Sequence, residues 1–305
     1  MTYDIRLIAP SGYPHDVPAV RRGVERLEAA GHRLSGLDVL DRRQLRFAGT
    51  DAERAGDLNA LVEGPLPDVV LAIRGGYGVH PLLPLLDYEG LRRLATAPVA
   101  LIGHSDFTAL QCALLARSGV VTLGGPMLAS DFGAPRLDAL TWDHVWHVLA
   151  SDQAEVAWES PGTPAVAVEG TIWGGNLAML TSLAGSPYFP EVDGGILYIE
   201  DVAEPPYRVE RMLYHLIHAG VLTRQKALVL GDFTSYRVAE YDNGYDLPLA
   251  FDRVAAAAGI PFVAGLPFGH GPTKVTLPFG SAGRLEVSGG RARLVFAGHP
   301  RPKTP

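Results

Sequence analysis

The stretch PVALIGHSDFTALQCALLAR, residues 98–117, decides the fold of this chain. It begins with a short and mostly apolar run, Pro98 to Gly103, that predicts a buried strand, and the pattern from Phe107 to Arg117 is helical. Only three residues connect the two elements. A strand, a tight turn and a helix in this order display the middle residue of the turn, Ser105, at a helix N-terminus, as in a nucleophile elbow. The stretch therefore predicts an α/β fold with one exposed serine.

Short β-branched runs alternate with helical patterns through the first half of the chain. Such alternation is typical of a parallel sheet wrapped by crossover helices. Thr50 and Glu53 have the three-residue spacing of a capping box, which predicts a helix running toward Leu61. Further expected elements are strands at Ile5 to Ala9, Asp68 to Ile73 and Val120 to Leu123, and a helix from Val17 to Leu27 that ends at Gly31. We expect an open parallel-sheet, flavodoxin-like domain over residues 1–150.

After about residue 150 the sequence becomes β-rich. Only two segments are helical in pattern, Met212 to Gly220 and Ala250 to Gly259. The strand-like segments are Ala154 to Glu159, Pro164 to Gly175, Gly194 to Asp201, Lys226 to Phe233 and Arg284 to Phe296. We therefore expect a linker over residues 151–164 and a β-rich C-terminal domain over residues 165–305. The expected fold class is α/β, with the open parallel-sheet domain followed by this β-rich domain.

The composition argues against several classes of protein. A formal net charge of -7 and a pI near 5.8 disfavour nucleic-acid binding, which needs clustered lysine and arginine to neutralise phosphates. Cys112 is the only cysteine, so we expect no internal disulfide and no cysteine-based zinc site. The start of the chain carries Arg6 and then a turn in place of a secretory apolar region, and the longest uncharged stretch, Gly170 to Pro190, is too rich in glycine and proline for a membrane helix. We expect a cytoplasmic protein with no nucleic-acid or membrane partner.

The sequence around the turn leaves two interpretations of Ser105 open. At a helix N-terminus the serine lies near unpaired backbone N–H groups and the positive end of the helix dipole, which stabilise developing negative charge. The usual elbow is GxSxG, however, and Phe107 replaces the second glycine, so a plain helix N-cap fits equally. His104 is a poor base for its neighbour, because adjacent side chains diverge on such a turn. Cys112 lies among leucine and alanine inside the helix, which indicates a core residue.

The turn RGGYG, residues 74–78, is a second candidate site. It follows a predicted strand, and its glycines allow backbone N–H groups to approach a ligand closely. It matches neither GxxxxGK[ST] nor GxGxxG. A phosphate cradle, an oxyanion donor and a plain turn all remain open. Ligands in open α/β sheets bind outside the carboxyl ends of strands, and both this turn and Ser105 follow such ends.

Two further polar residues stand in apolar surroundings in the second half. Glu200 ends a strand, where it either orients a histidine or pairs with an arginine such as Arg208. His270 lies between two glycines; it suits a general base by its near-neutral pKa, but a structural histidine fits equally. His215 and His218 lie three apart on a predicted helix without the glutamate of HExxH, so we expect one packed and one solvated residue and no metal site.

Longer segments, taken in order, resemble the LD-carboxypeptidase family of serine peptidases, and within it the members that act on murein tetrapeptides. The resembling segments are APSG (9–12), FAGTDAERAGDLN (47–59), RGGYGVHPLLPLLDY (74–88), LIGHSDFTALQCALL (101–115), GGPMLASDFGA (124–134), GTIWGGNLAML (170–180), GILYIEDVAEPPYRVERML (195–213) and GLPFGHGPTKVTLPFG (265–280). They run almost from end to end. The sequence departs from the family at YIED, where leucine commonly precedes the glutamate, and in the residues after His270. Neither departure touches a proposed catalytic atom.

The resemblance implies a catalytic triad. Ser105 is expected as the nucleophile, Glu200 as the orienting acid and His270 as the base, with the serine in the N-terminal domain and the other two in the C-terminal domain. For the oxyanion hole we expect the backbone N–H groups of Gly76 and Asp106. No metal and no organic cofactor is required.

The resemblance also implies a substrate. The expected reaction removes the terminal D-alanine of a murein tetrapeptide, at the bond that joins it to the L-centre of the diamino acid, in cytoplasmic peptidoglycan recycling. The terminal carboxylate needs a cationic or N–H-rich partner, for which we expect Arg74 and the backbone of the WGGN segment, with Trp173 and Asn176. A muropeptide is the expected partner, and a homodimer is an expectation from the family.

Three alternatives remain. Within the family, an immunity-type serine peptidase would cleave a peptide-nucleotide antibiotic. A catalytically silent peptide-binding protein would keep the cleft without the chemistry. An α/β-hydrolase esterase shares the chain order serine, acid, histidine, but its second half would continue the strand-helix alternation, which stops here near residue 150.

Overall fold

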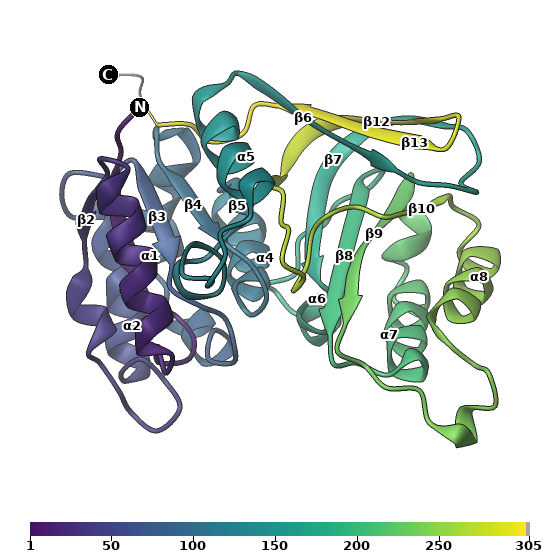
Figure 1. Cartoon of the computed structure of the whole chain (residues 1–305), viewed down its shortest axis with the longest axis horizontal. Coiled ribbons are helices and arrows are strands. Elements are labelled where there is room, and N and C mark those ends of the chain that lie inside the picture. Colours follow the sequence, from purple (N-terminus) through teal and green to yellow (C-terminus); the bar gives the residue numbers. More distant parts are fainter. Residues whose placement is uncertain (303–305) are drawn as a thin grey trace.

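The computed structural model describes residues 1–302, and Figure 1 shows two sheets side by side, each with its own helices. The first sheet has the order β11-β5-β4-β3-β1-β2. Its strands are β1 Asp4–Ile8, β2 Arg33–Ser35, β3 Val69–Ala72, β4 Ala100–Gly103, β5 Thr122–Gly124 and β11 Leu277–Phe279. All pairs are parallel except β11 with β5. The order 2-1-3-4-5 of the first five strands is that of flavodoxin-like sheets, so the expected fold class is confirmed.

The helices of the first half begin and end largely at the expected signals. They are α1 Val17–Ala29, α2 Asp51–Asn59, α3 Tyr88–Leu91, α4 Phe107–Ser118 and α5 Ala139–Ala150. The capping box of Thr50 and Glu53 is formed and starts α2. Gly119, with a φ of 67°, ends α4 in the left-handed region that glycine adopts without strain.

The second sheet has the order β10-β9-β8-β7-β12-β13-β6. Its strands are β6 Gln153–Glu159, β7 Val166–Asn176, β8 Ile196–Val202, β9 Ala227–Thr234, β10 Phe262–Ala264, β12 Ser281–Ser288 and β13 Arg291–Ala297. From β10 to β7 the strands are parallel, and from β7 to β6 they are antiparallel. The helices of this half are α6 Leu177–Leu183, α7 Pro206–His218 and α8 Leu247–Ala258.

Short helical turns connect these elements. The 3-10 turns are η1 Leu37–Leu40, η2 Ala60–Val62, η3 His80–Leu85, η4 Arg92–Thr96, η6 Leu222–Arg224 and η7 Glu240–Asp242, and η5 Leu128–Phe132 is a π-helical turn. No helix within residues 1–302 is both long and apolar enough to cross a membrane.

Three features differ from the sequence-based expectation. The strand expected at Ala154 to Glu159 is present as β6, but because it pairs with β13 the segment 151–164 is part of the second sheet and not only a linker. The strand β11, from the expected C-terminal domain, completes the first sheet by pairing with β5. The helix α6 was not expected, because seven residues directly after a strand carry too little periodic signal, but Asn176 caps it with a side-chain hydrogen bond.

The hydrophobic core runs through both halves. One cluster of buried residues joins α2 and α4 on one face of the first sheet to α6, α7 and α8 on one face of the second. The other cluster joins α1 and α5 to the opposite faces of both sheets. The packing of α4 against α6 brings the N-terminus of α4 close to the carboxyl ends of β7 and β8. The functional site lies at this junction.

Candidate active site

Ser105 lies at the turn between β4 and α4 with a φ of 62°, in the left-handed region that residues with a side chain rarely adopt. Such strain is characteristic of the serine of a nucleophile elbow. The ring of Phe107, which is fully buried, fills the space beside Gly103, where an added Cβ would lie 2.6 Å from the ring. Gly103, two positions before the serine, therefore makes room for the ring of Phe107. Phe107 itself stands where the usual GxSxG motif has its second glycine.

His270 approaches this serine on a loop of the second half. Gly269 has a φ of 152°, and a Cβ there would lie 2.7 Å from the Cβ of Asp232 and 3.2 Å from the Cβ of Glu200. Only glycine lets the loop pass so close to the ends of β8 and β9. The sequence-based expectation that these glycines bring His270 close to other chain segments is confirmed.

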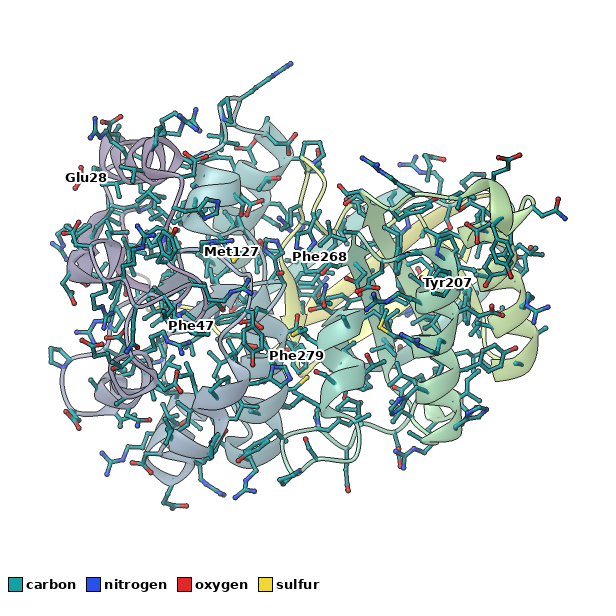
Figure 2. All side chains as sticks on the ribbon, turned by 90° about the horizontal axis from the view of Figure 1, so that it is seen from below. Glu28, Phe47, Met127, Tyr207, Phe268 and Phe279 are labelled. Atoms are coloured by element: carbon teal, nitrogen blue, oxygen red, sulfur yellow. The ribbon has the colours of Figure 1, made fainter. Side chains whose placement is uncertain are left out.

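Phe268 anchors the same loop. Its ring packs edge-on against Tyr198 of β8, with the ring centroids 5.1 Å apart. Figure 2 shows Phe268 and Met127 at the junction between the two halves. Both side chains are buried. Apolar packing therefore positions the His270 loop through Phe268 on one side of the junction and the segment of Met127 on the other.

The three expected triad residues meet in one hydrogen-bonded chain. His270 Nε2 lies 3.1 Å from Ser105 Oγ, and His270 Nδ1 lies 2.6 Å from Glu200 Oε2. Because an ionised carboxylate only accepts, Nδ1–H donates to Glu200 and the serine hydroxyl donates to Nε2. Glu200 is fully buried, whereas 22% of the His270 side chain is exposed. Hydroxyl, imidazole and carboxylate stand in the order that serine hydrolases use.

The surroundings of His270 stabilise the charged form of its ring relative to a free imidazole. Burial by itself lowers the pKa of His270, but the hydrogen bond and the charge of Glu200 outweigh it and raise the pKa above its ordinary value. Burial, and then the charge of Glu200, raise the pKa of Asp201 to about 6. The site can therefore hold an imidazolium, which is the state that a general base reaches after it takes a proton.

Asn176 positions these two carboxylates. Its Nδ2 donates to Glu200 Oε1 at 3.2 Å and to Asp201 Oδ1 at 3.0 Å, and its Oδ1 accepts from the N–H of Met179 at 3.1 Å. Its backbone N–H donates to Thr108 Oγ1 on α4 at 3.1 Å. The polar groups of this buried side chain are all used inside the protein. The expected substrate contact by Asn176 is corrected accordingly: this residue holds the Glu200 carboxylate in place.

The WGGN segment is explained by close packing. A Cβ on Gly174 would lie 1.8 Å from a backbone oxygen of β8, and one on Gly175 would lie 2.6 Å from Thr108 Oγ1. Trp173 is 1% exposed, and its indole N–H donates to Gln225 Oε1 at 3.0 Å inside the core. The Trp173 side chain therefore serves core packing, and a substrate contact by the backbone of this segment stays a prediction.

Gly75 is the residue of the RGGYG turn that touches the elbow. A Cβ on Gly75 would lie 2.9 Å from both Cβ and Oγ of Ser105 and 3.4 Å from the backbone N of Asp106. Gly76 follows it, exposed and with a φ of 110°. Among residues 1–302 the N–H groups of Gly76 and Asp106, the expected oxyanion donors, have no acceptor. The sequence indicated that this turn faces Ser105 but did not single out Gly75.

Asp106 fastens the turn to the elbow. Its Oδ2 accepts from Ser11 Oγ at 2.7 Å and from the N–H of Val79 at 3.0 Å. Burial raises the pKa of Asp106, and these two hydrogen bonds lower it in part. The buried guanidinium of Arg54 donates to backbone oxygens of the same two loops. The loops that follow β1, β3 and β4 are thus joined at one edge of the sheet.

Several other candidates lie in structural roles. Arg208 pairs with Glu204 at 2.8 Å, so the alternative pairing with Glu200 is wrong. His104 is buried and its Nδ1 donates to the backbone oxygen of Gly125 at 3.1 Å. Burial, together with the charge of a nearby lysine, lowers the pKa of His104 well below its ordinary value, so this ring stays neutral.

The helix candidates carry no site among the described residues. His215 and His218 are both exposed on α7, which corrects the expectation that one of them is packed. Within residues 1–302, no three histidine, cysteine, aspartate or glutamate side chains come together as ligands for a metal ion. Cys112 is fully buried, and burial raises the pKa of its thiol, in agreement with a core residue.

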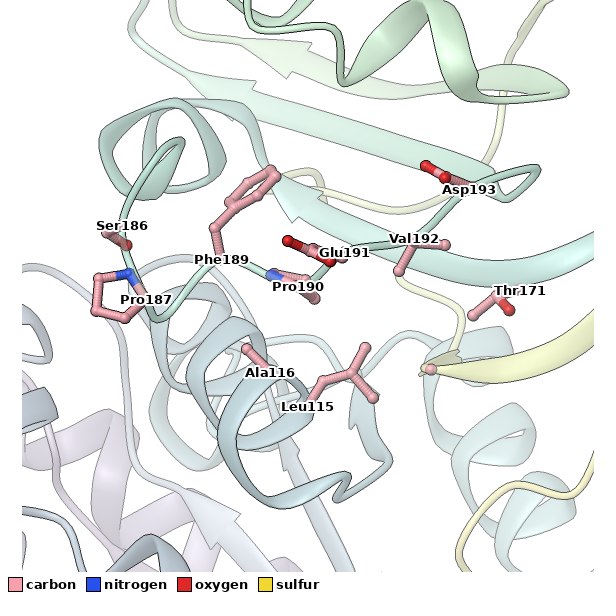
Figure 3. A pocket seen from close by; sticks show the side chains of 11 residues that line it. Leu115, Ala116, Thr171, Ser186, Pro187, Phe189, Pro190, Glu191, Val192 and Asp193 are labelled. Carbon is pink, nitrogen blue, oxygen red and sulfur yellow. The ribbon is translucent and has the colours of Figure 1, made fainter.

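A hollow of about 620 Å³ lies elsewhere, between the end of α4 and the segment Ser186–Asp193 (Figure 3). Leu115 lies in its wall, eight residues along α4 from Phe107, which places it roughly 12 Å along the helix from the elbow at 1.5 Å per residue. This hollow is separate from the triad.

Both halves of the chain match one known family. Residues 5–125 match the LD-carboxypeptidase N-terminal domain, and residues 169–285 match the LD-carboxypeptidase C-terminal domain. The chain belongs to the LD-carboxypeptidase family. The resemblance found in the sequence is confirmed, and with it a hydrolase that acts as a peptidase.

Relatives within the family carry two kinds of name. The murein tetrapeptide carboxypeptidase of Pseudomonas aeruginosa is 34% identical over 88% of this chain and 91% of its own length. The microcin C7 self-immunity protein MccF of Escherichia coli is 29% identical over 85% of this chain and 83% of its own length. The chain is therefore similar both to a relative named for murein tetrapeptides and to one named for self-immunity to microcin C7.

Solved structures of the family superpose on both halves of the chain. The muramoyltetrapeptide carboxypeptidase from Oxalobacter formigenes has a TM-score of 0.91 and 41% identity, covering 98% of this chain and 100% of that one. MccF in complex with glutamyl sulfamoyl guanosine has a TM-score of 0.86 and 26% identity, covering 98% and 97%.

Proposed function

We propose that this protein is a serine carboxypeptidase that removes the terminal D-alanine from murein tetrapeptides. The observation that carries the proposal is the chain from Ser105 Oγ through His270 to the buried Glu200 carboxylate, which begins on a residue with a left-handed backbone. The higher identity to a muramoyltetrapeptide carboxypeptidase than to MccF favours this substrate. We place the reaction in the recycling of cell-wall peptides in the cytoplasm.

The first half of the proposed reaction forms an acyl-enzyme. Ser105 Oγ attacks the carbonyl carbon of the terminal peptide bond while His270 Nε2 takes the hydroxyl proton. The N–H groups of Gly76 and Asp106 donate to the resulting oxyanion. His270 then gives the proton to the leaving nitrogen, the C–N bond breaks, and D-alanine departs with its amino group.

The second half reverses the roles. His270 Nε2 takes a proton from a water molecule, whose oxygen attacks the acyl carbon, and then returns that proton to Ser105 Oγ as the ester bond breaks. Glu200 keeps its charge throughout and stabilises the imidazolium in both steps. The shortened peptide leaves with a new carboxylate.

The test is release of D-alanine from a tetrapeptide, followed by mass. We expect wild type to release it and Ser105→Ala to lose on the order of a millionfold in kcat, as in other triads. Ser35→Ala, on the exposed edge strand β2, is the matched control and keeps wild-type activity. No release by wild type, or substantial activity of Ser105→Ala, would refute the proposal. If wild type binds the tetrapeptide but does not cleave it, the protein is the catalytically silent peptide-binding alternative.

The likeness to MccF favours a second candidate, hydrolysis of an amide bond between a peptide and a nucleotide. The same three residues would carry it, with the nucleotide as the leaving group. Comparing kcat/KM for a tetrapeptide and for a peptidyl nucleotide decides between them. A higher value for the nucleotide substrate would replace the murein assignment.

A further inference from the structure

An uncompensated pair of positive charges lies beside the elbow. Neighbouring Arg42 and Arg54 pair with Asp57 and Asp51, but within residues 1–302 neither Arg46 nor Arg74 has a carboxylate partner. The chain as a whole has 33 acidic and 26 basic residues, yet no acidic side chain among residues 1–302 pairs with either of these two arginines. An anion that binds between them would supply the counter-charge.

The guanidinium of Arg74 is held in a fixed place. Its Nη1 donates to the backbone oxygen of Tyr13 at 3.2 Å and to His15 Nδ1 at 2.9 Å, which sets the proton of that imidazole on Nε2. A Cβ on Gly12 would lie 2.8 Å from Nη1, and one on Gly76 would lie 3.4 Å from Nη2. Two glycines therefore leave room for this half-buried side chain, and its remaining N–H groups are available to a ligand.

Arg46 adds a second guanidinium to the same place. Its backbone oxygen accepts from the N–H of Tyr13, and its side chain lies over the ring of Tyr77, 5.8 Å from the centroid. Burial, followed by the charge of Arg46, lowers the pKa of Arg74, which shows that the two charges act on each other. Two like charges that act on each other repel unless a counter-charge lies between them.

The pair stands where the topology of the sheet predicts a ligand. The order reverses between β1 and β3, and ligands of such sheets bind at this switch point, outside the carboxyl ends of the strands. Arg74 follows β3, and the next residue, Gly75, packs against Ser105. A leaving group of one amino acid spans only about 3.8 Å between neighbouring Cα atoms, so its carboxylate must be bound close to the nucleophile.

We propose that Arg46 and Arg74 form a subsite for the free carboxylate of the substrate's terminal residue, with Tyr77 as its wall. This inference rests on the proposed function and deepens it, because it explains why cleavage is confined to the last bond. Guanidinium groups match the planar geometry of a carboxylate through two parallel hydrogen bonds.

The first experiment compares two peptides that differ only in the end group. A tetrapeptide ending in D-alanine and its C-terminal amide are offered to wild type, Arg46→Gln, Arg46→Lys and Arg74→Gln. Hydrogen bonds to charged groups are worth about 1.5–3 kcal/mol, so we expect each glutamine variant to lose about 10- to 150-fold in kcat/KM on the acid and the acid-to-amide ratio to fall with it. Arg46→Lys loses less, since it keeps the charge without the second hydrogen bond.

Arg211→Gln, an exposed position on α7, is the matched control and keeps the wild-type ratio. Because Arg46 is also exposed, its variants test the subsite even where Arg74→Gln disturbs the loop. Wild type that cleaves acid and amide equally well, or variants that slow both peptides by the same factor, would overturn the subsite.

The second experiment separates this inference from the proposed function. Ser105→Ala, with and without Arg46→Gln, is titrated with the acid peptide, the amide peptide and inorganic phosphate. Tighter binding of the acid, weakened about tenfold or more by Arg46→Gln, supports the subsite even where wild type releases no D-alanine. Equal binding of acid and amide overturns it, and binding of phosphate but not of the acid peptide assigns the pair to a phosphoryl group instead.

Discussion

Replacing Gly75 with alanine tests how closely the RGGYG turn must approach Ser105, the proposed nucleophile. The new Cβ would lie 2.9 Å from both Cβ and Oγ of Ser105, closer than such atoms normally approach, so something must move. Gly75 does not have a positive φ, so the substitution adds a methyl group without backbone strain. Either the serine side chain turns away, breaking its 3.1 Å contact with His270, or the turn moves and takes the N–H of Gly76 with it.

Both movements harm catalysis. Overpacking of this kind costs about 1–3 kcal/mol, and each 1.36 kcal/mol is a tenfold change in rate, so we expect kcat to fall about 5- to 150-fold. A displacement near 1 Å at the reacting atoms alone accounts for about 100-fold. The assay is D-alanine release with kcat and KM measured separately, beside the free energy of unfolding in urea.

Gly56→Ala is the control for the same chemical change. Nothing lies within 4 Å of the added Cβ on this glycine of α2, so we expect wild-type kcat and a gain of about 0.5–1 kcal/mol in stability. Gly75→Ala with wild-type kcat would refute the reasoning, because it would show that the turn can retreat from Ser105 without loss.

The other predictions concern the network behind the triad. Glu200→Gln keeps the shape of the acid and removes its charge, so kcat falls about 10⁴-fold, as for a triad aspartate changed to its amide. His270 must be neutral to take a proton, and in this variant it loses the partner that raises its pKa. The acid limb of the kcat/KM profile therefore moves to lower pH. If the limb does not move, it reports the titration of a group other than His270. Asn176→Asp removes two hydrogen bonds to carboxylates and adds a third negative charge, so we expect the free energy of unfolding at pH 8 to fall by about 3 kcal/mol or more. At pH 5 the loss is smaller, because this pH lies below the pKa of Asp201 of about 6 and Asp201 is then largely neutral. An equal loss at both pH values in urea titrations contradicts this. Arg54→Met leaves two backbone oxygens without their donor, so we expect the free energy of unfolding to fall by about 1–3 kcal/mol for each oxygen. A loss below about 1 kcal/mol in urea unfolding would show that the oxygens find other donors.

The elements that could be predicted from the sequence are those with a local signal. The capping box before α2, the glycine after α4 and the apolar run of β4 each lie within a few residues of the element that they define. The order of the sheet follows from the same alternation, since short crossovers between parallel strands leave few arrangements. The position of the serine at the end of β4 could be predicted for the same reason.

The rest depends on contacts between distant segments. The strand β11 has three residues and pairs with β5, which lies more than 150 residues earlier, so nothing near it in the sequence indicates its sheet. Asn176 was expected at the substrate because its neighbours are unusual, but both glycines before it serve the packing of β7 against β8 and α4. The unusual WGGN sequence indicated that this segment packs closely against another part of the chain. Only the structure shows that its neighbours are β8 and α4 and not a substrate.

The strain at Ser105 shows the same limit in energetic terms. A left-handed backbone at a residue with a side chain costs about 1–2 kcal/mol, and the turn keeps it only if other contacts exceed that cost. The carboxylate of Asp106 supplies them through Ser11 and Val79, since hydrogen bonds to a charged group are worth about 1.5–3 kcal/mol each. The two donors, Ser11 and Val79, lie on the loops after β1 and β3. The sequence motif therefore indicates which residue is strained, but the residues that hold it in place lie elsewhere in the chain. The motif therefore functions only in a sheet that brings these loops together, which is why a short match to it alone did not decide between a nucleophile and a helix cap.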